Sequence, residues 1–259
     1  LQVLDPGRRA DAVAQGRTMI LSVILPTYNE AQNIARIIAA ITKVFSDEAI
    51  EGEVIVVDDD SPDGTARIAS GLSGSCPVSV RVRTGARGLS RAVIEGFGLA
   101  RGDVCVVMDA DLSHPVERIP DLISPIRAGT CDIVVGSRYM TGGGAPDWPR
   151  RRKLFSRAAG LLARGVVPLS DPTSGFMAVR KDTLRGIELD PLGWKIVLEV
   201  VVRSKARVRE IPIVFRDRTQ GQSKFGVGAQ VDYLRQLRRL YAFRYPLLRG
   251  RPSRSLTKR

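Results

Sequence analysis

Two aspartates follow an apolar stretch in the segment VVMDADLSHP, at residues 106–115. They are Asp109 and Asp111, and the chain's single histidine, His114, comes three positions after the second. Alternate carboxylates in an extended segment or a tight turn reach the same side, and one or two carboxylates with substrate phosphates and water make the usual site for Mg²⁺ or Mn²⁺. A single histidine forms no zinc cluster, and the adjacent Pro115 favours a turn role for it. The segment therefore predicts a Mg²⁺ or Mn²⁺ site at the two aspartates.

A second acidic cluster closes another apolar stretch, EVIVVDDD at residues 53–60. It consists of Asp58, Asp59 and Asp60. In open parallel sheets ligands bind beyond the carboxyl ends of the strands, so we expect both acidic clusters at one sheet edge, where they repel each other unless a cation joins them. The alternative is that the aspartates cap the helices that follow. Two such clusters in a chain with few acids elsewhere favour the ligand site.

Strands and helices alternate along the chain and must position these carboxylates. Apolar runs predict strands at residues 21–25, 53–60, 78–83, 103–109 and 132–137. Helical spacing predicts helices near residues 34–45, 65–72, 88–101 and 116–128. Asn29 with Gln32 three positions later resembles a capping box before the first helix. Alternating elements whose strands are apolar on both faces indicate an α/β fold with a mainly parallel sheet covered on two sides.

The chain has 259 residues, of which 44% are hydrophobic, and this is enough for one domain with a sizeable core. We expect an arm at residues 1–18, the α/β domain at residues 19–226, and a basic helix and tail at residues 227–259. No apolar run approaches the roughly 18–20 residues that span a bilayer, and the first residues lack the apolar centre of a signal peptide. We therefore expect a soluble or peripheral protein. The three cysteines are flanked by apolar residues and are expected to pack as reduced thiols.

The formal net charge of +13 calls for an anionic partner: nucleic acid, a phosphorylated small molecule or an acidic membrane surface. The basic residues continue to the end of the chain, whereas no acid follows Asp232. In the same region Val231, Leu234, Leu237 and Tyr241 recur at helical spacing. This pattern predicts a basic amphipathic helix that lies on anionic lipid. The alternative is a surface helix packed on the domain.

Several other classes of protein are disfavoured by missing motifs. The sequence has no GxxxxGK[ST] or GxGxxG segment, which argues against P-loop enzymes and ordinary dinucleotide binders. It has no GxSxG elbow, and a Ser/His/Asp triad would have to use His114. A nucleic-acid-binding protein predicts basic residues interleaved with aromatics, yet aromatics make up only 5% of the chain. A nucleotidyltransferase would need a glycine-rich triphosphate loop near the first strand, where this chain has PTYNE.

Six motifs occur in the order seen in the polyprenyl-phosphate (dolichyl-phosphate) mannose synthases. They are PTYNE (26–30), VVDDDSPDGTA (56–66), MDADLSHP (108–115), VGSRY (135–139), DPTSGF (171–176) and FRDRTQGQSK (215–224). The chain resembles these enzymes over roughly residues 19–226. The resemblance implies an inverting family 2 glycosyltransferase with the GT-A fold, a Rossmann-like, mainly parallel sheet flanked by helices. It also implies transfer of mannose from GDP-mannose to a polyprenyl monophosphate at the cytoplasmic face of a membrane.

The resemblance assigns roles to residues on the donor side. The nucleoside pocket would contain Pro26, Tyr28, Glu30, Asp58, Asp59 and Asp60. The metal and the sugar nucleotide would be held by Asp109, Ala110 and Asp111. Ser113 stands where some relatives have a glutamine that also contacts the metal, and Asp60 stands where many have glycine. The segment GLSRA (88–92) replaces a GLGxA pattern.

The resemblance also assigns basic residues to the substrates' phosphates. Arg138, Arg152 and Ser156 match the positions that grip the acceptor phosphate. Arg218 and Lys224, with Ser223 between them, match the segment that closes over the nucleotide diphosphate. Together with the two aspartates, the arginines at 138 and 218 are the predicted catalytic residues.

This reaction explains why no general base stands out in the sequence. A lipid monophosphate already presents an anionic oxygen at neutral pH, because its second pKa is about 6. The protein then has to align two anionic substrates and stabilise the departing diphosphate. A polyprenyl-phosphate glucosyltransferase that uses UDP-glucose is the open alternative, since nothing in the sequence distinguishes guanine from uracil. A membrane subunit or a transmembrane segment is a further expected partner of this kind of enzyme.

Overall fold

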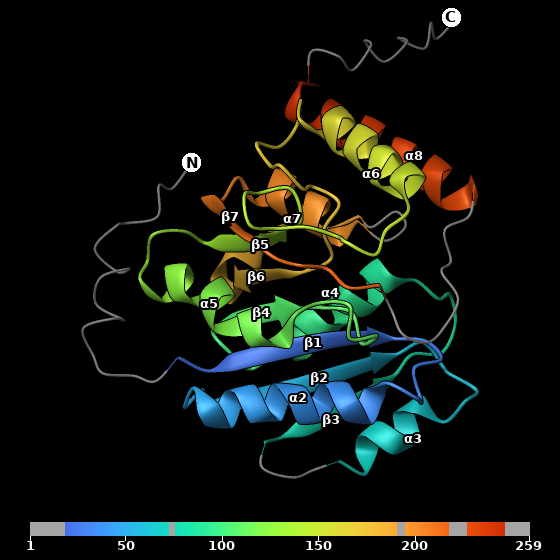
Figure 1. The fold of residues 1–259 in the computed structure, drawn as a ribbon, viewed down its shortest axis with the longest axis vertical. Helices are drawn as coiled ribbons and strands as arrows, with labels where there is room; N and C mark the ends of the chain where they lie inside the picture. The colour runs from blue at the N-terminus through green and yellow to red at the C-terminus, as the bar shows by residue number, and fades with distance from the viewer. Residues whose placement is uncertain (1–18, 73–75, 191–194, 218–226, 247–259) are drawn as a thin grey trace, which may run out of the picture.

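A seven-stranded sheet forms the centre of the computed structural model, which describes residues 19–72, 76–190, 195–217 and 227–246 (Figure 1). The strands are β1 (Leu21–Thr27), β2 (Gly52–Asp58), β3 (Val78–Val82), β4 (Val104–Val107), β5 (Ile133–Ser137), β6 (Met177–Arg180) and β7 (Val208–Pro212). Their order across the sheet is β3-β2-β1-β4-β6-β5-β7. All neighbours pair in parallel except β6, which runs antiparallel between β4 and β5. The predicted α/β fold with a mainly parallel sheet is confirmed.

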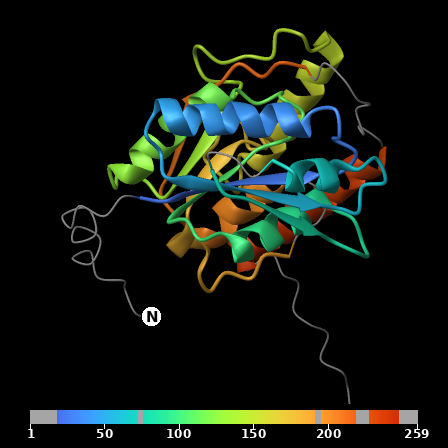
Figure 2. The ribbon, with the colours of Figure 1, turned by 90° about the horizontal axis from the view of Figure 1, so that it is seen from below.

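Helices cover both faces of this sheet. They are α2 (Ile34–Asp47), α3 (Thr65–Ser70), α4 (Leu89–Leu99), α5 (Ile119–Arg127), α6 (Arg150–Ala163), α7 (Ile196–Ser204) and α8 (Val227–Arg244), with short 3₁₀ turns η1 (Val116–Arg118) and η2 (Lys181–Leu184). Figure 2 shows α2 on one side of the sheet and α4 on the other. One apolar cluster joins α2 and α5 to the sheet, and a second joins α4, α7 and α8 to its opposite face.

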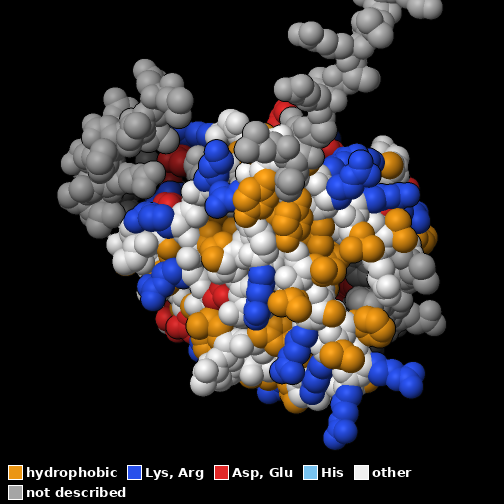
Figure 3. All heavy atoms as spheres, turned by 90° about the horizontal axis from the view of Figure 1, so that it is seen from above, with side chains coloured by type: hydrophobic (Ala, Val, Ile, Leu, Met, Phe, Trp, Pro, Cys, Tyr) orange, Lys and Arg blue, Asp and Glu red, His pale blue; other side chains and the backbone are white. Residues whose placement is uncertain are grey.

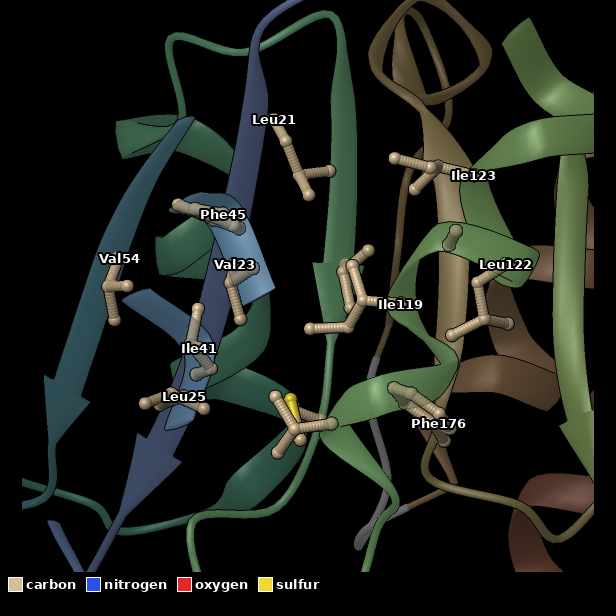
Figure 4. Packing of buried hydrophobic residues seen from close by; sticks show 14 of the residues in the cluster. Leu21, Val23, Leu25, Ile41, Phe45, Val54, Ile119, Leu122, Ile123 and Phe176 are labelled. Atoms are coloured by element: carbon tan, nitrogen blue, oxygen red, sulfur yellow. The ribbon is translucent and has the colours of Figure 1, made fainter. Parts of the chain in front are cut away.

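The core follows the alternation of side chains along the central strands. Val23 and Leu25 of β1 lie in the same cluster as Ile41 of α2, as the close view in Figure 4 shows. Ile24, between them, lies in the second cluster, against α4. A Cβ at Gly96 of α4 would collide with Ile24, so glycine is what permits this close approach. Burial of each such aliphatic side chain contributes about 1.5–3 kcal/mol, which makes the sheet a rigid base for the loops at its edge.

The start of α2 differs from the sequence prediction. The helix begins at Ile34, and Asn29 takes a left-handed backbone conformation with φ of 61° instead of capping it. The backbone N–H of Asn29 donates to the Ser61 hydroxyl at 2.9 Å, across to the loop after β2. The capping-box prediction was therefore wrong, because a contact between two loops determines the conformation of this asparagine.

The predicted apolar face of α8 is partly buried against the rest of the protein and partly exposed to solvent. Leu237 is buried in the second apolar cluster, whereas Val231 is 40% and Leu234 is 55% exposed. Hydrogen bonds fix the helix on α6, among them the one from the Tyr233 hydroxyl to the carbonyl of Ala159 at 2.5 Å. The single apolar stripe is thus corrected to a packed part and an exposed part. No helix within the described ranges is long and apolar enough to cross a bilayer.

Candidate active site

The two aspartates of the DADLSHP segment lie just beyond the carboxyl end of β4. Asp111 is buried and Asp109 is partly buried. The backbone N–H of Asp109 donates to Nδ1 of His114 at 3.0 Å, and the imidazole stacks on Phe176 with ring centroids 5.1 Å apart. Burial lowers the pKa of His114, which keeps the ring neutral and able to accept this hydrogen bond. His114 therefore shapes the loop, in agreement with its predicted turn role.

Leu112 and Ser113 complete this loop in a strained conformation. Leu112 has φ of 63°, a left-handed conformation that costs a non-glycine residue about 1–3 kcal/mol. The next backbone N–H, that of Ser113, donates to the Asp111 carboxylate at 3.0 Å. The Ser113 hydroxyl is buried and has no hydrogen-bond partner among the described residues. Two carboxylates and an unsatisfied hydroxyl are hard oxygen donors of the type that Mg²⁺ and Mn²⁺ prefer.

The number of donors on the protein side is small. Within the described residues no group of three or more His, Cys, Asp or Glu side chains is arranged to hold a metal ion. A cation at Asp109 and Asp111 would thus take further ligands from a substrate and from water, as Mg²⁺ commonly does. The residues fit a divalent ion that is shared with a phosphorylated substrate.

Asp58, at the end of β2, ties two loops together. Its buried carboxylate accepts hydrogen bonds from the Thr27 hydroxyl at 2.7 Å and from the Ser61 backbone N–H at 2.8 Å. The helix that follows, α3, is served by a different acid, because the Thr65 backbone N–H donates to Asp63 at 3.0 Å. Asp58 is therefore a scaffold for the predicted nucleoside pocket and not a cap of that helix.

Asp59 and Asp60 face different surroundings. The buried carboxylate of Asp59 accepts hydrogen bonds from the Arg83 guanidinium and from the Gly88 backbone N–H, the latter at 2.7 Å. Gly88 opens the GLSRA segment, so this segment is anchored beside the pocket. Asp60 is exposed and has φ of 55°. Aspartate tolerates this left-handed conformation better than most residues.

The remaining nucleoside-pocket residues lie where β1 ends. Pro26 is in β1, and Tyr28 and Glu30 follow it. The guanidinium of Arg87 lies 4.2 Å from the centre of the Tyr28 ring and donates to the Tyr28 hydroxyl at 2.6 Å. The Glu30 backbone N–H donates to the Thr65 hydroxyl at 2.9 Å. The loops after β1, β2 and β3 thus meet at one edge, and the arginines that the sequence analysis missed come from the last of these loops.

On the other side of Asp109 a buried ion pair joins the VGSRY and DPTSGF motifs. Arg138 is 8% exposed, and its guanidinium donates to both carboxylate oxygens of Asp171 at 2.6 and 2.7 Å. It also donates to the Thr173 hydroxyl at 2.9 Å. Burial alone would raise the pKa of Asp171, but the Arg138 charge holds that pKa below its ordinary value. The structure thus places Arg138 in the expected region, with its charge already paired.

Arg152 and Ser156, from α6, lie close to the buried pair of Arg138 and Asp171. Arg152 donates to the Asp217 carboxylate at 3.1 Å and lies 4.0 Å from the centre of the Trp148 ring. The hydroxyl of Ser156 is 3.4 Å from the Thr173 hydroxyl. The indole N–H of Trp148 is buried and has no hydrogen-bond partner among the described residues. The three predicted acceptor-phosphate residues therefore converge around Thr173 and Trp148.

Lys195 is a further member of this group that the sequence analysis missed. Its ammonium donates to the backbone carbonyl of Thr173 at 2.8 Å. Burial, and then the positive charge of Arg138, lower its pKa to about 8. The lysine stands in LGWK, before α7, where no recognisable motif surrounds it.

Gly175 connects this cationic group to the acidic loop. A Cβ at this position would lie 3.7 Å from the Asp109 carboxylate oxygens and 3.4 Å from the His114 ring. The DPTSGF segment thus has Thr173 on the cationic side, and its Gly175, two residues later, lies close to the Asp109 carboxylate. The predicted contacts of Arg218 and Lys224 with the diphosphate lie outside the described residues and stay predictions.

The chain matches the family model described as glycosyl transferase family 2 over residues 22–187. The protein belongs to this family. Its relatives include proteins named dolichol-phosphate mannosyltransferase, which confirms the resemblance found in the sequence. The one from Pyrococcus furiosus is 46% identical over 230 residues, which cover 86% of this chain and 64% of the relative. The one from Saccharomyces cerevisiae is 36% identical over 236 residues, which cover 86% of this chain and 88% of the relative.

Solved structures with the same fold come from enzymes that make sugar phosphoglycerates. Mannosyl-3-phosphoglycerate synthase from Rubrobacter xylanophilus superposes with a TM-score of 0.69 at 17% identity, covering 96% of this chain and 80% of the other. Glucosyl-3-phosphoglycerate synthase from Mycobacterium tuberculosis, in complex with Mn²⁺, UDP-glucose and glycerol 3-phosphate, has a TM-score of 0.62 at 22% identity, covering 94% and 85%. These structures confirm the predicted GT-A fold.

Proposed function

We propose that the protein transfers mannose from GDP-mannose to a polyprenyl monophosphate, with inversion at the sugar, to give polyprenyl-phosphate-mannose. The relatives named dolichol-phosphate mannosyltransferase support this substrate pair. The observation that carries the proposal is the proximity of Gly175 to the Asp109 carboxylate, because Gly175 follows Thr173 of the cationic group by two residues. This proximity supports an acidic site for a metal-bound diphosphate next to a basic site for a second phosphate.

On the donor side, the loops after β1, β2 and β3 would enclose the nucleoside. Pro26, Tyr28 and Glu30 would line the pocket with Asp59 and its neighbours. Asp109 and Asp111, with Ser113, would hold Mg²⁺ or Mn²⁺, and the ion would neutralise charge on the departing diphosphate. The Mn²⁺ and UDP-glucose of the Mycobacterium tuberculosis structure support a divalent ion and a nucleotide sugar in this fold.

On the acceptor side, the phosphate would bind to Arg138, Arg152 and Ser156. The phosphate brings its own nucleophilic oxygen, ionised at neutral pH, so the protein has to position it against the anomeric carbon. The pairing of Arg138 with Asp171 would hold the Arg138 guanidinium in position before the substrate arrives. Fixed dipoles and charges of this kind lower the barrier because they need no reorganisation during the reaction.

A membrane surface would supply the lipid acceptor. Helix α6 exposes apolar side chains that include Leu154 at 70% and Phe155 at 59% exposure. Leu234 of α8 is also exposed. Figure 3 shows apolar side chains among Lys and Arg side chains on the face where α6 and α8 lie. Apolar side chains mixed with cations are typical of helices at an anionic membrane interface. We place the protein peripherally at the cytoplasmic face, with a membrane subunit or a transmembrane segment as the alternative anchor.

The proposal is tested by product formation. Purified protein with Mn²⁺, GDP-mannose and a short-chain polyprenyl phosphate should yield a mannosyl phospholipid, detected by mass spectrometry. The matched control is the same polyprenol without phosphate, which should give no product. A parallel reaction with UDP-glucose tests the alternative donor, for which the Mycobacterium tuberculosis structure is the motivating observation. Absence of product with every sugar nucleotide would contradict the proposed activity.

A further inference from the structure

The three cations around Thr173 differ in their partners. Arg138 is paired with Asp171, and Arg152 with Asp217. Lys195 instead donates to a neutral backbone carbonyl, and among the residues that the structure describes it forms no ion pair with a carboxylate. Lys195 is therefore the cation of this group whose charge remains to be balanced.

The surroundings of Lys195 make that imbalance costly. Arg138 approaches from the end of β5 and Arg152 from α6, while Asp171 precedes β6 and Asp109 follows β4. From α8 the neutral side chain of Gln236 donates to the Lys195 carbonyl at 3.1 Å. A buried ammonium with two guanidinium groups nearby is unfavourable, which is why its pKa falls to about 8. A bound dianion would supply the missing negative charge.

A second, independent observation comes from Trp148, which lies against both arginines of this group. The buried indole N–H of Trp148, between Arg138 at 4.7 Å and Arg152 at 4.0 Å from its ring centre, has no acceptor among the described residues. A buried donor without a partner costs about 1–3 kcal/mol. A phosphate offers several acceptor oxygens to such donors. The group thus has an unbalanced charge and an unsatisfied donor, both of which a phosphate would satisfy.

We propose that Lys195 binds the phosphate of the acceptor lipid and supplies the charge that attracts it. This inference rests on the proposed function and refines it, because it adds Lys195 to Arg138, Arg152 and Ser156 as a group that binds the acceptor phosphate. The donor's diphosphate carries similar chemistry, so the experiment must separate the two sources of phosphate.

The test measures equilibrium binding, which does not require turnover. Calorimetry would compare wild type, Lys195→Met and Lys195→Arg with a short-chain polyprenyl phosphate, the matching polyprenol, and GDP with Mn²⁺. Lys205→Met is the control, because Lys205 is an exposed lysine at the other end of α7. Loss of a hydrogen bond to a charged group predicts a fall of about tenfold or more in affinity of Lys195→Met for the lipid phosphate. Binding of polyprenol and of GDP should change less than about twofold, a difference within ordinary surface-substitution effects.

The pH dependence provides a readout that a purely structural role would not change. With a pKa of about 8, Lys195 is charged below pH 8 and neutral above it in the free protein. Wild-type affinity for the lipid phosphate should therefore fall about tenfold per pH unit above pH 8, while Lys195→Arg should keep its affinity over that range because a guanidinium stays protonated there. Circular dichroism would verify that each variant is folded.

Three results would overturn the inference. They are unchanged lipid-phosphate binding in Lys195→Met, a loss of GDP affinity without loss of lipid-phosphate affinity, and a pH profile of Lys195→Arg identical to wild type. Failure of the proposed function gives a different result. In that case wild type forms no mannosyl lipid, even if the Lys195 variants change the affinity for lipid phosphate. If product forms equally in wild type and Lys195→Met, the function stands and the inference fails.

Discussion

The proposed donor side and the proposed acceptor side of the sheet edge differ in which charged groups are held and by which partners. On the donor side, carboxylates such as Asp58 and Asp59 are held by hydroxyl groups, backbone N–H groups and one arginine. On the acceptor side, arginines are held by carboxylates, and Lys195 is left with a backbone carbonyl. A metal-bound diphosphate and a bare phosphate call for these two different environments. The comparison explains how a strongly basic chain keeps an acidic site within it.

The two sides also differ in how they are kept rigid. Three non-glycine residues with left-handed backbones, Asn29, Asp60 and Leu112, lie in the loops after β1, β2 and β4. Such conformations persist only where the surrounding contacts impose them. The acceptor side relies instead on the buried pair between Arg138 and Asp171. Strained loops preorganise the donor side, and ion pairs preorganise the acceptor side.

The largest effect is expected from Asp111→Asn. The substitution deletes a proposed metal ligand without changing core volume, and it should lower the turnover rate by about a thousandfold or more, because metal stabilisation of a leaving diphosphate contributes several kcal/mol. Steady-state assays measure the rate, and thermal unfolding should match wild type. Asp121→Asn, at an exposed ion pair with Arg118, is the control. A variant with the wild-type rate would mean that the metal site lies elsewhere.

Asp171→Asn should break the acceptor side by leaving Arg138 buried without its counter-charge. Removal of one partner of a buried pair costs about 3–5 kcal/mol of unfolding free energy, measured by urea denaturation. The double variant Asp171→Asn with Arg138→Met should recover part of that loss, since it removes the stranded charge. Equal stability of Asp171→Asn and wild type would show that the pair does not hold this region together.

Arg152→Ala should weaken the use of the lipid phosphate and leave the donor side intact. We expect the KM for the acceptor to rise about tenfold, the effect of about 1.4 kcal/mol of lost interaction, with GDP affinity unchanged. Acceptor and donor titrations separate the two parameters. If GDP affinity falls and the acceptor kinetics do not change, the two sides have been assigned in reverse.

Arg83→Gln should have a smaller effect, confined to the donor side. It removes one of the two groups that fix the Asp59 carboxylate, and GDP affinity should fall a few fold because the Gly88 backbone N–H still holds that carboxylate. Arg81→Gln is the matched control, because Arg81 also pairs with Glu95 but does not contact Asp59. A change in lipid-phosphate affinity in Arg83→Gln, or the same change in both variants, would argue against two separate sides.

The positions of the acidic residues on the proposed donor side could be predicted from the sequence because their signals are local. Asp58, Asp59, Asp109 and Asp111 each follow an apolar strand directly, and the edge of a parallel sheet brings strand ends together. The acceptor side depends on β6, which inserts antiparallel between β4 and β5. This long-range pairing places Asp171 on Arg138 and Thr173 near Lys195, and no spacing rule within a short window encodes it.

Tertiary contacts also explain the local errors. Asn29 satisfies the spacing of a capping box, yet its backbone is bound to Ser61 in another loop. The apolar stripe of α8 has the right period, but α6 and α7 cover only part of it, and Leu234 stays exposed. Periodicity predicted that these elements exist. Contacts with neighbouring elements determine the backbone conformation of Asn29 and which residues of α8 are buried.

The central claim is that a divalent ion joins the carboxylates after β4 to a nucleotide diphosphate beside a cationic pocket. The most direct measurement is an anomalous-scattering map of a crystal soaked with Mn²⁺ and GDP. We predict a manganese peak within about 2.0–2.6 Å of an Asp109 or Asp111 oxygen and of a GDP phosphate oxygen. Manganese bound elsewhere, with both carboxylates turned away from GDP, would contradict the account.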